Sequence, residues 1–261
     1  IRLSLVGSEM CIRDSNYSFP ENDGIITNQK IKANIEVVEQ SMLKVVIKVS
    51  LILRLPESLT DDRKTRSSTL RDFPLVSWLT LEVDSPILEF RTELKNTVKD
   101  HRLRILFPTN IDAEFSYAGT QFDITKHKIT PETFNNRELS EEVKRVIIGA
   151  REAEPITTFP HRYFVDINDG QRGIAVLNKG LPEYEILPDK NTIALTLFRS
   201  VGWLARSDLL TRIGDAGPTI FTPDAQCLRQ MNFKYAIYFH QGDCHQARIF
   251  QLAEEFNTDL I

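Results

Sequence analysis

The sequence lacks the short motifs that assign a function most directly. It has no GxxxxGK[ST] or GxGxxG loop for binding phosphates and no GxSxG nucleophile elbow. Its net charge of −4 at pH 7 removes the electrostatic reason to expect nucleic acid or an anionic membrane. No apolar run is long enough to span a bilayer, because Lys44 and Lys48 interrupt the most apolar segment, Met42 to Leu55. The sequence therefore predicts no nucleic-acid partner and no membrane partner.

Cysteine is also scarce, with Cys11, Cys227 and Cys244 as the whole complement. Their spacing fits neither a zinc ribbon nor a disulfide framework, so we expect a reducing compartment and a cytoplasmic location. The segment His240 to His245 holds several metal-ligand residue types, but it has neither CxxC nor HExxH spacing. The alternative is a strand end followed by a helix cap at Asp243. We predict no metal site in this chain.

What the sequence does contain is a series of strand patterns. Val, Ile and Leu alternate with polar residues, and Pro, Asp, Asn and Gly interrupt the runs where turns are expected. The expected strands are Ile35 to Val38, Leu43 to Leu55, Ser77 to Val83, Ile87 to Leu94, His101 to Phe107, Tyr163 to Ile167, Gly173 to Leu177, Tyr184 to Leu187, Thr192 to Phe198 and Lys234 to Phe239. Many strands and little helix predict a mainly β chain, a large antiparallel β-sandwich.

Two segments show helical patterns. Ser140 to Ala150 begins with a possible N-cap and acidic residues, although a mobile insertion fits the same residues. Asp243 to Phe256 has a capping box formed by Asp243 and Gln246, followed by an apolar face. The fold prediction therefore includes one or two short helices.

The first residues do not fit this pattern. Leu5 to Ser15, LVGSEMCIRDS, looks like an in-frame translation of a sequencing adapter. We therefore interpret residues 1–15 as a non-native artefact and leave them out of the predicted fold. Residues 16–33 are interpreted as a loop or linker, and residues 34–261 as the β-sandwich.

The segment Gly180 to Arg212 is the strongest candidate for a binding site. An apolar strand ends at Arg199, and Trp203, Arg206 and Asp208 follow within one loop. Sugars stack on aromatic faces, and charged side chains hold their hydroxyl groups, so this combination indicates carbohydrate contact. The alternative is an Arg–Asp network that fixes a long loop to the sandwich.

Two further polar clusters are candidates for other roles. Glu183 and Glu185 point the same way if their segment is a strand, and paired carboxylates are typical of glycosidases. The alternative for this pair is a solvated strand face. Asp100 and Arg102 are expected to pair across one face and to serve structure.

Five segments together resemble the C-terminal β domains of glycoside hydrolase family 38, the α-mannosidases, and are closest to its microbial, mannosylglycerate-hydrolase-like branch. They are DHRLRILFPT (Asp100 to Thr109), HRYFVDINDGQRGIAVLNKGLPEYEI (His161 to Ile186), LTLFRSVGWLARSDLLTR (Leu195 to Arg212), AGPTIFTPDAQC (Ala216 to Cys227) and FKYAIYFHQGD (Phe233 to Asp243). The resemblance covers roughly Asn34 to Leu260. It implies a sandwich of the galactose-mutarotase-like supersandwich type.

The resemblance also implies a function. Members are retaining enzymes that hydrolyse α-mannosidic bonds with an aspartate nucleophile and a divalent metal, usually zinc. Both belong to an N-terminal barrel that has no counterpart in this chain, so we expect no catalytic residue here and a catalytically silent fragment, truncated on both sides. Expected partners are an α-mannoside substrate, the protein's own barrel and copies of the same chain in a homo-oligomer. The expected substrate-binding residues are Arg199, Trp203, Arg206 and Asp208, with Tyr184 as a weaker candidate.

Two alternatives stay open at this point. The first is a stand-alone carbohydrate-binding or scaffolding β-sandwich that binds sugar through Trp203 or Tyr184. The second is a mutarotase-like enzyme, which requires His161, His240 and Glu183 to face one pocket.

Overall fold

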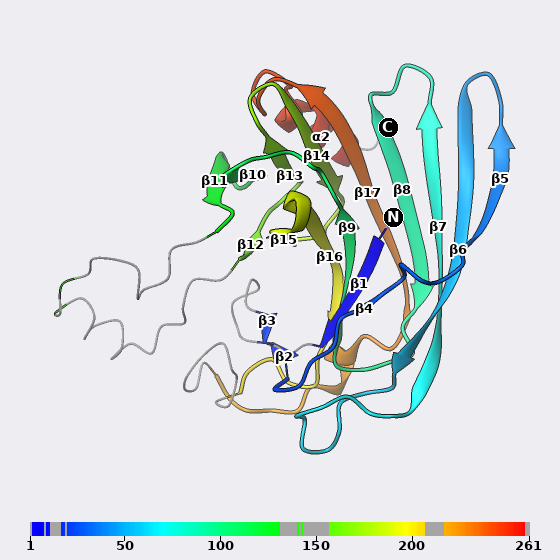
Figure 1. Ribbon diagram of the computed structural model, residues 1–261, viewed down its shortest axis with the longest axis vertical. Coiled ribbons are helices and arrows are strands. Elements are labelled where there is room, and N and C mark those ends of the chain that lie inside the picture. The colour runs from blue at the N-terminus through cyan, green and yellow to red at the C-terminus, as the bar shows by residue number, and fades with distance from the viewer. Residues whose placement is uncertain are drawn as a thin grey trace.

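The computed structural model describes residues 2–7, 9–10, 17–18, 20–130, 140, 142, 157–206 and 217–258, with side chains described from residue 20 onward. Over these residues two large β-sheets pack face to face, and each pairing between described strands is antiparallel (Figure 1). This arrangement confirms the prediction of a mainly β, antiparallel sandwich.

The larger sheet has nine strands in the order β11-β10-β13-β14-β17-β8-β7-β6-β5. Figure 1 shows β5 to β8 as a long curved surface that extends beyond the smaller sheet. The strands are β5 (Asn34–Gln40), β6 (Lys44–Pro56), β7 (Leu70–Glu82), β8 (Ile87–Lys95), β10 (Phe115–Gly119), β11 (Ile124–Lys128), β13 (Phe164–Asn168), β14 (Arg172–Asn178) and β17 (Gln230–Gln241).

The smaller sheet has six strands in the order β12-β15-β16-β9-β1-β4. They are β1 (Arg2–Gly7), β4 (Ile26–Thr27), β9 (His101–Phe107), β12 (Thr158–Pro160), β15 (Glu183–Leu187) and β16 (Thr192–Ser200). A separate pair joins β2 (Glu9–Met10) to β3 (Tyr17–Ser18).

Strand β1 belongs to the segment that the sequence analysis left out of the fold. It pairs with β9 from Arg2 opposite Leu106 to Gly7 opposite His101, and with β4 on its other side. The segment interpreted as a linker likewise contains β3 and β4. The structure therefore places part of the first 33 residues within the sheets.

The main core lies between the two sheets. The larger sheet contributes Leu53, Phe73 and Tyr235, and the smaller sheet contributes Leu103 and Ile105, all buried. On β9 the alternation is as predicted, with Leu103, Ile105 and Phe107 in this core. The opposite face of β9 is buried as well, so its polar residues are enclosed and need partners.

A second apolar cluster lies on the outer face of the larger sheet, where helix α2 (Ile249–Asn257) covers β13, β14 and β17. The predicted capping contacts are present, since Asp243 Oδ1 accepts hydrogen bonds from the backbone N–H groups of His245 and Gln246. They close a turn rather than start the helix, because Arg248 has a φ of 50° and interrupts the helical conformation. The predicted start at Asp243 was therefore wrong.

The other predicted helix, Ser140 to Ala150, lies almost wholly outside the described residues. No helix in the described ranges is long and apolar enough to cross a membrane. Two short 3-10 turns, η2 (Asp189–Asn191) and η3 (Pro223–Gln226), complete the secondary structure used below.

Candidate functional site

Buried charges gather on the outer face of the six-stranded sheet. Alternation along β15 turns Tyr184 toward the core and sends Glu183 and Glu185 to the opposite face. The neighbouring strands β9 and β16 place Arg102 and Arg199 directly opposite each other on that face. Like charges in this position repel each other, so the pair requires an anion between them.

Glu183 supplies that anion. Its Oε1 accepts a hydrogen bond from Arg102 Nη1 at 3.1 Å and another from Thr196 Oγ1 at 2.6 Å. Its Oε2 lies 3.3 Å from Arg199 Nη1. Only 3% of the Glu183 side chain is exposed, so these contacts replace water around the carboxylate.

Glu185 extends the cluster along the same strand. Arg104 donates a hydrogen bond to Glu185 Oε2, and Arg102 Nη2 lies 3.5 Å from the same atom. Thr157 donates to Oε1. We call Arg102, Arg104, Arg199, Glu183 and Glu185 the Arg–Glu cluster.

The Arg–Glu cluster corrects two expectations. Glu183 and Glu185 do share a face, as predicted, but that face is buried and ion-paired rather than solvated. Asp100 does not pair with Arg102. It accepts a hydrogen bond from Gln226 Nε2 at 2.6 Å, and its backbone N–H donates to Gln226 Oε1 at 3.0 Å.

Gln226 anchors the start of the predicted sugar loop. It is buried. The hydroxyl group of Ser200, the last residue of β16, donates a hydrogen bond to Gln226 Oε1 at 2.7 Å. Gly202 follows, and a side chain there would lie 3.1 Å from the Phe221 ring and 3.2 Å from Gln226 Nε2. Close packing against Phe221 and Gln226 therefore explains why a glycine fits this position.

Two cationic side chains lie close to the ring of Trp203. The guanidinium carbon of Arg63 is 5.0 Å from the indole centroid, and that of Arg206 is 5.4 Å away. Phe221 packs at 4.9 Å with its ring tilted, and its backbone forms a β-bridge with Trp203. Guanidinium groups close to an indole ring form cation–π contacts, so Trp203 and its neighbours form one ordered unit.

The other predicted binding residues differ in accessibility. Arg199 is 15% exposed at its side chain, Arg206 is buried, and Asp208 lies outside the described residues. Tyr184 is 0% exposed, and its hydroxyl lies 3.0 Å from Ser116 Oγ across the sandwich. Burial raises the pKa of Tyr184, in keeping with a phenol held in the core. Tyr184 is thus out of reach of a ligand in solution.

The mutarotase-like arrangement is not formed. His161 packs against Tyr184 between the sheets, with ring centroids 5.1 Å apart, and burial lowers its pKa to about 4. Glu183 lies on β15 with Tyr184, but its side chain is on the outer face of the sheet. His240 lies on the outer face of the other sheet, where its Nε2 is 2.9 Å from Asp166 Oδ1. The three residues do not face one pocket.

The segment His240 to His245 is likewise committed to other contacts. His240 pairs with Asp166, Asp243 closes a turn, and Cys244 is buried against the sheet. Burial raises the pKa of the Cys244 thiol to about 11, and the carboxylates of Asp166 and Asp243 act in the same direction. Within the described part of the chain no group of three or more His, Cys, Asp or Glu side chains could hold a metal ion.

Comparisons with known proteins bear directly on these segments. Residues 14–225 match the family model for the glycosyl hydrolases family 38 C-terminal domain. A protein of Halalkalibacterium halodurans named "Putative mannosylglycerate hydrolase" is 28% identical over 95% of this chain, which covers 25% of that protein.

Two solved structures from Enterococcus faecalis agree with this match. One is an alpha-mannosidase of strain V583, with a TM-score of 0.81 and 26% identity over 98% of this chain and 27% of its own. The other is a protein in the glycosyl hydrolase family 38, with a TM-score of 0.79 and 26% identity over 98% of this chain and 28% of its own.

The chain thus spans about a quarter of the length of these relatives. The family model matches most of the sequence, including β9, the Arg–Glu cluster and the Trp203 segment. The chain belongs to glycoside hydrolase family 38, as a C-terminal β domain of that family.

Proposed function

We propose that this chain is the non-catalytic β domain of a longer retaining α-mannosidase, in which it supports the catalytic barrel and contributes to carbohydrate binding. The observation that carries the proposal is the match to a family C-terminal domain by a chain that spans about a quarter of its relatives. Hydrolysis of α-mannosidic bonds is then a property of the longer protein.

The catalytic groups belong, on this proposal, to the barrel. The family resemblance implies an aspartate nucleophile and a divalent metal, usually zinc, in that part of the longer protein. The carboxylates of the Arg–Glu cluster have a different role in this chain, because both are engaged by arginines. A carboxylate fixed between guanidinium groups positions side chains rather than attacking a sugar.

We assign the carbohydrate contact to the segment after β16. Trp203 offers a partly exposed indole, and Arg199 at the strand end is the least buried arginine of the Arg–Glu cluster. Glu183 fixes Arg199, and Arg63 and Arg206 fix the indole, so little side-chain freedom is lost when a sugar binds. Asp208 stays a candidate on the strength of the sequence alone. Tyr184 is left out because it is buried.

Calorimetry with α-linked mannose oligosaccharides tests this assignment. We expect Trp203→Ala to weaken binding by about tenfold, because an aromatic contact contributes on the order of 1 kcal/mol. Tyr184→Phe is the matched control, since it alters a buried ring and should leave affinity unchanged. If Trp203→Ala and the parent chain bound the mannose oligosaccharides with equal affinity, the assignment of the carbohydrate contact to Trp203 would be wrong.

A further inference from the structure

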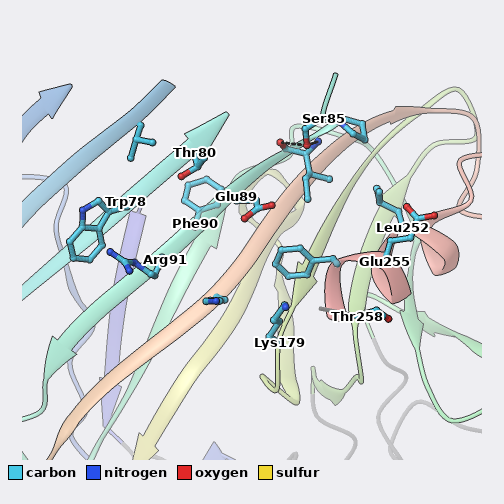
Figure 2. Close-up of a pocket in the computed structure, with 15 residues that line it drawn as sticks. Trp78, Thr80, Ser85, Glu89, Phe90, Arg91, Lys179, Leu252, Glu255 and Thr258 are labelled. Carbon is cyan, nitrogen blue, oxygen red and sulfur yellow. Dashed lines mark hydrogen bonds between the residues drawn. The ribbon is translucent and has the colours of Figure 1, made fainter. Parts of the chain in front are cut away.

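A groove runs along the outer face of the nine-stranded sheet, between β7 and β8 on one side and α2 on the other. Figure 2 shows Trp78, Thr80, Glu89 and Arg91 projecting from neighbouring strands into one space, with Glu255 on α2 opposite them. The groove has a volume of about 790 Å³, within the range of small-molecule sites.

Trp78 forms an aromatic wall of this groove. It lies directly opposite Arg91 across the strand pair, and the guanidinium carbon of Arg91 is 4.2 Å from the indole centroid. Its other cross-strand neighbour, Lys48, is held 3.4 Å from Glu36. The indole is therefore fixed in place and remains partly exposed, which suits it to pack against the C–H face of a sugar ring.

The polar lining carries both signs of charge. Arg91, Lys179 and Lys234 bring cations, and Glu89 and Glu255 bring carboxylates. Burial, together with nearby Glu82, raises the pKa of Glu89, whereas Lys179 and Lys234 act in the opposite direction. A strongly anionic ligand would meet the two carboxylates, and a cationic one would meet the three cations. A neutral ligand with many hydroxyl groups can use both kinds of side chain.

We propose that this groove is a second carbohydrate-binding site, which takes a neutral oligosaccharide with one ring packed on Trp78. Thr80, Ser85 and Thr258 add hydroxyl groups along the groove, so its polar contacts extend beyond a single sugar ring. A peptide-binding groove would instead need a continuous apolar stripe or a free strand edge, and β7 and β8 are paired on both sides.

The groove is separate from the segment that carries Trp203. Trp78 lies on the nine-stranded sheet, and Trp203 follows β16 of the six-stranded sheet. The sequence contains two tryptophans, so each candidate site has its own fluorescent reporter. Trp203→Phe leaves Trp78 as the reporter of the groove, and Trp78→Phe leaves Trp203 as the reporter of the other site.

The experiment titrates both variants with α-linked mannose oligosaccharides, a probe whose choice rests on the proposed function. We expect a saturable change in tryptophan emission in the Trp203→Phe variant. Adding Glu89→Gln to that variant should weaken the response by about tenfold, because a hydrogen bond to a charged carboxylate becomes a weaker one to a neutral amide. Adding Glu114→Gln, an exposed carboxylate outside the groove, should leave it unchanged. Near-ultraviolet circular dichroism confirms that each variant is folded.

The outcomes separate this inference from the proposed function. A saturable change in emission in the Trp203→Phe variant, weakened by Glu89→Gln, supports binding in the groove. This holds whether or not the Trp78→Phe variant also responds. A response confined to Trp78→Phe overturns the groove and leaves the proposed contact at Trp203 in place. A folded Trp203→Phe variant with no response, or one in which Glu89→Gln and Glu114→Gln behave alike, also overturns the groove.

Discussion

The outer faces of the two sheets both carry buried charge, but in chemically different forms. On the six-stranded sheet the Arg–Glu cluster joins guanidinium groups to carboxylates, and arginine stays charged at every pH of interest. On the nine-stranded sheet the pair is His240 with Asp166, and histidine changes charge near neutral pH. The first cluster is a permanent network, whereas the second depends on solution conditions.

The difference shows how burial sets the role of a charged residue. Glu183 and Glu93 are both strand glutamates that face away from the main core, yet the Glu183 side chain is 3% exposed and that of Glu93 is 32% exposed. Glu183 has lost its water and depends on Arg102, Arg199 and Thr196. Glu93 keeps water and gains little from Arg91.

Breaking the Arg–Glu cluster should produce the largest effect. We expect Glu183→Gln to lower the free energy of unfolding by about 3 kcal/mol, because it leaves Arg102 and Arg199 facing each other without their shared anion. Glu93→Gln, the matched control, should change it by less than about 0.5 kcal/mol. Urea denaturation measures both, and equal values for the two variants would show that burial does not distinguish these carboxylates.

The packing around His240 should give a smaller loss. A Cβ added at Gly173 would lie 2.2 Å from His240 Cε1 and Nε2, and this ring is buried and paired with Asp166. We expect Gly173→Ala to lower the free energy of unfolding by about 2 kcal/mol through this overlap. Gly24→Ala, which meets nothing within 4 Å, should be nearly neutral. Similar thermal denaturation midpoints for the two variants would contradict the steric account.

The smallest effect should be the dependence of stability on pH that the His240–Asp166 pair of the nine-stranded sheet provides. Burial lowers the pKa of His240, but its hydrogen bond and charge interaction with Asp166 outweigh this, and the net pKa is raised above 6.5. A raised pKa means that the stabilisation is fully present below pH 6.5 and is lost as the pH rises through the folded-state value.

The measurement is the free energy of unfolding between pH 5.5 and pH 9, a range set by the unfolded and raised folded pKa of His240. The stability of the parent chain relative to that of His240→Gln should fall across this range. His101 and His161 act in the opposite direction in the lower part of this range, because burial lowers their folded-state pKa to about 3 and about 4 while the unfolded chain takes up protons near pH 6.5. Their contribution is common to both proteins and cancels in the difference between the parent chain and His240→Gln. If the free energy of unfolding had the same pH dependence in the parent chain and in His240→Gln, that dependence would come from other groups.

Much of the fold could be predicted because its strands alternate cleanly and end at turn residues. His101 to Phe107 was predicted with the bounds that the structure has, since Pro108 stops it. Strands β10 and β11 were missed because their residues, FSYAG and ITKHK, are short, small or polar. They are strands because β13 offers an edge for pairing, which is a tertiary cause.

The sites were harder to predict. That Glu183 and Glu185 share a face follows from alternation along a strand, but their partner Arg102 lies about eighty positions away in the sequence. Trp78 gave no local signal, because it stands in an ordinary strand pattern and acquires Arg91 and Glu89 as neighbours only through sheet pairing. The sequence therefore predicts which residue types can form a site, but it does not predict which of them are buried or which residues lie opposite them on neighbouring strands.

The central claim is that this chain contributes to carbohydrate binding without cutting the sugar. The direct test is hydrolysis of an aryl α-mannoside by the purified chain, with and without added zinc. The account predicts product formation no faster than in buffer under both conditions. Turnover that rises in proportion to the concentration of the chain, and that persists through repeated purification, would contradict it.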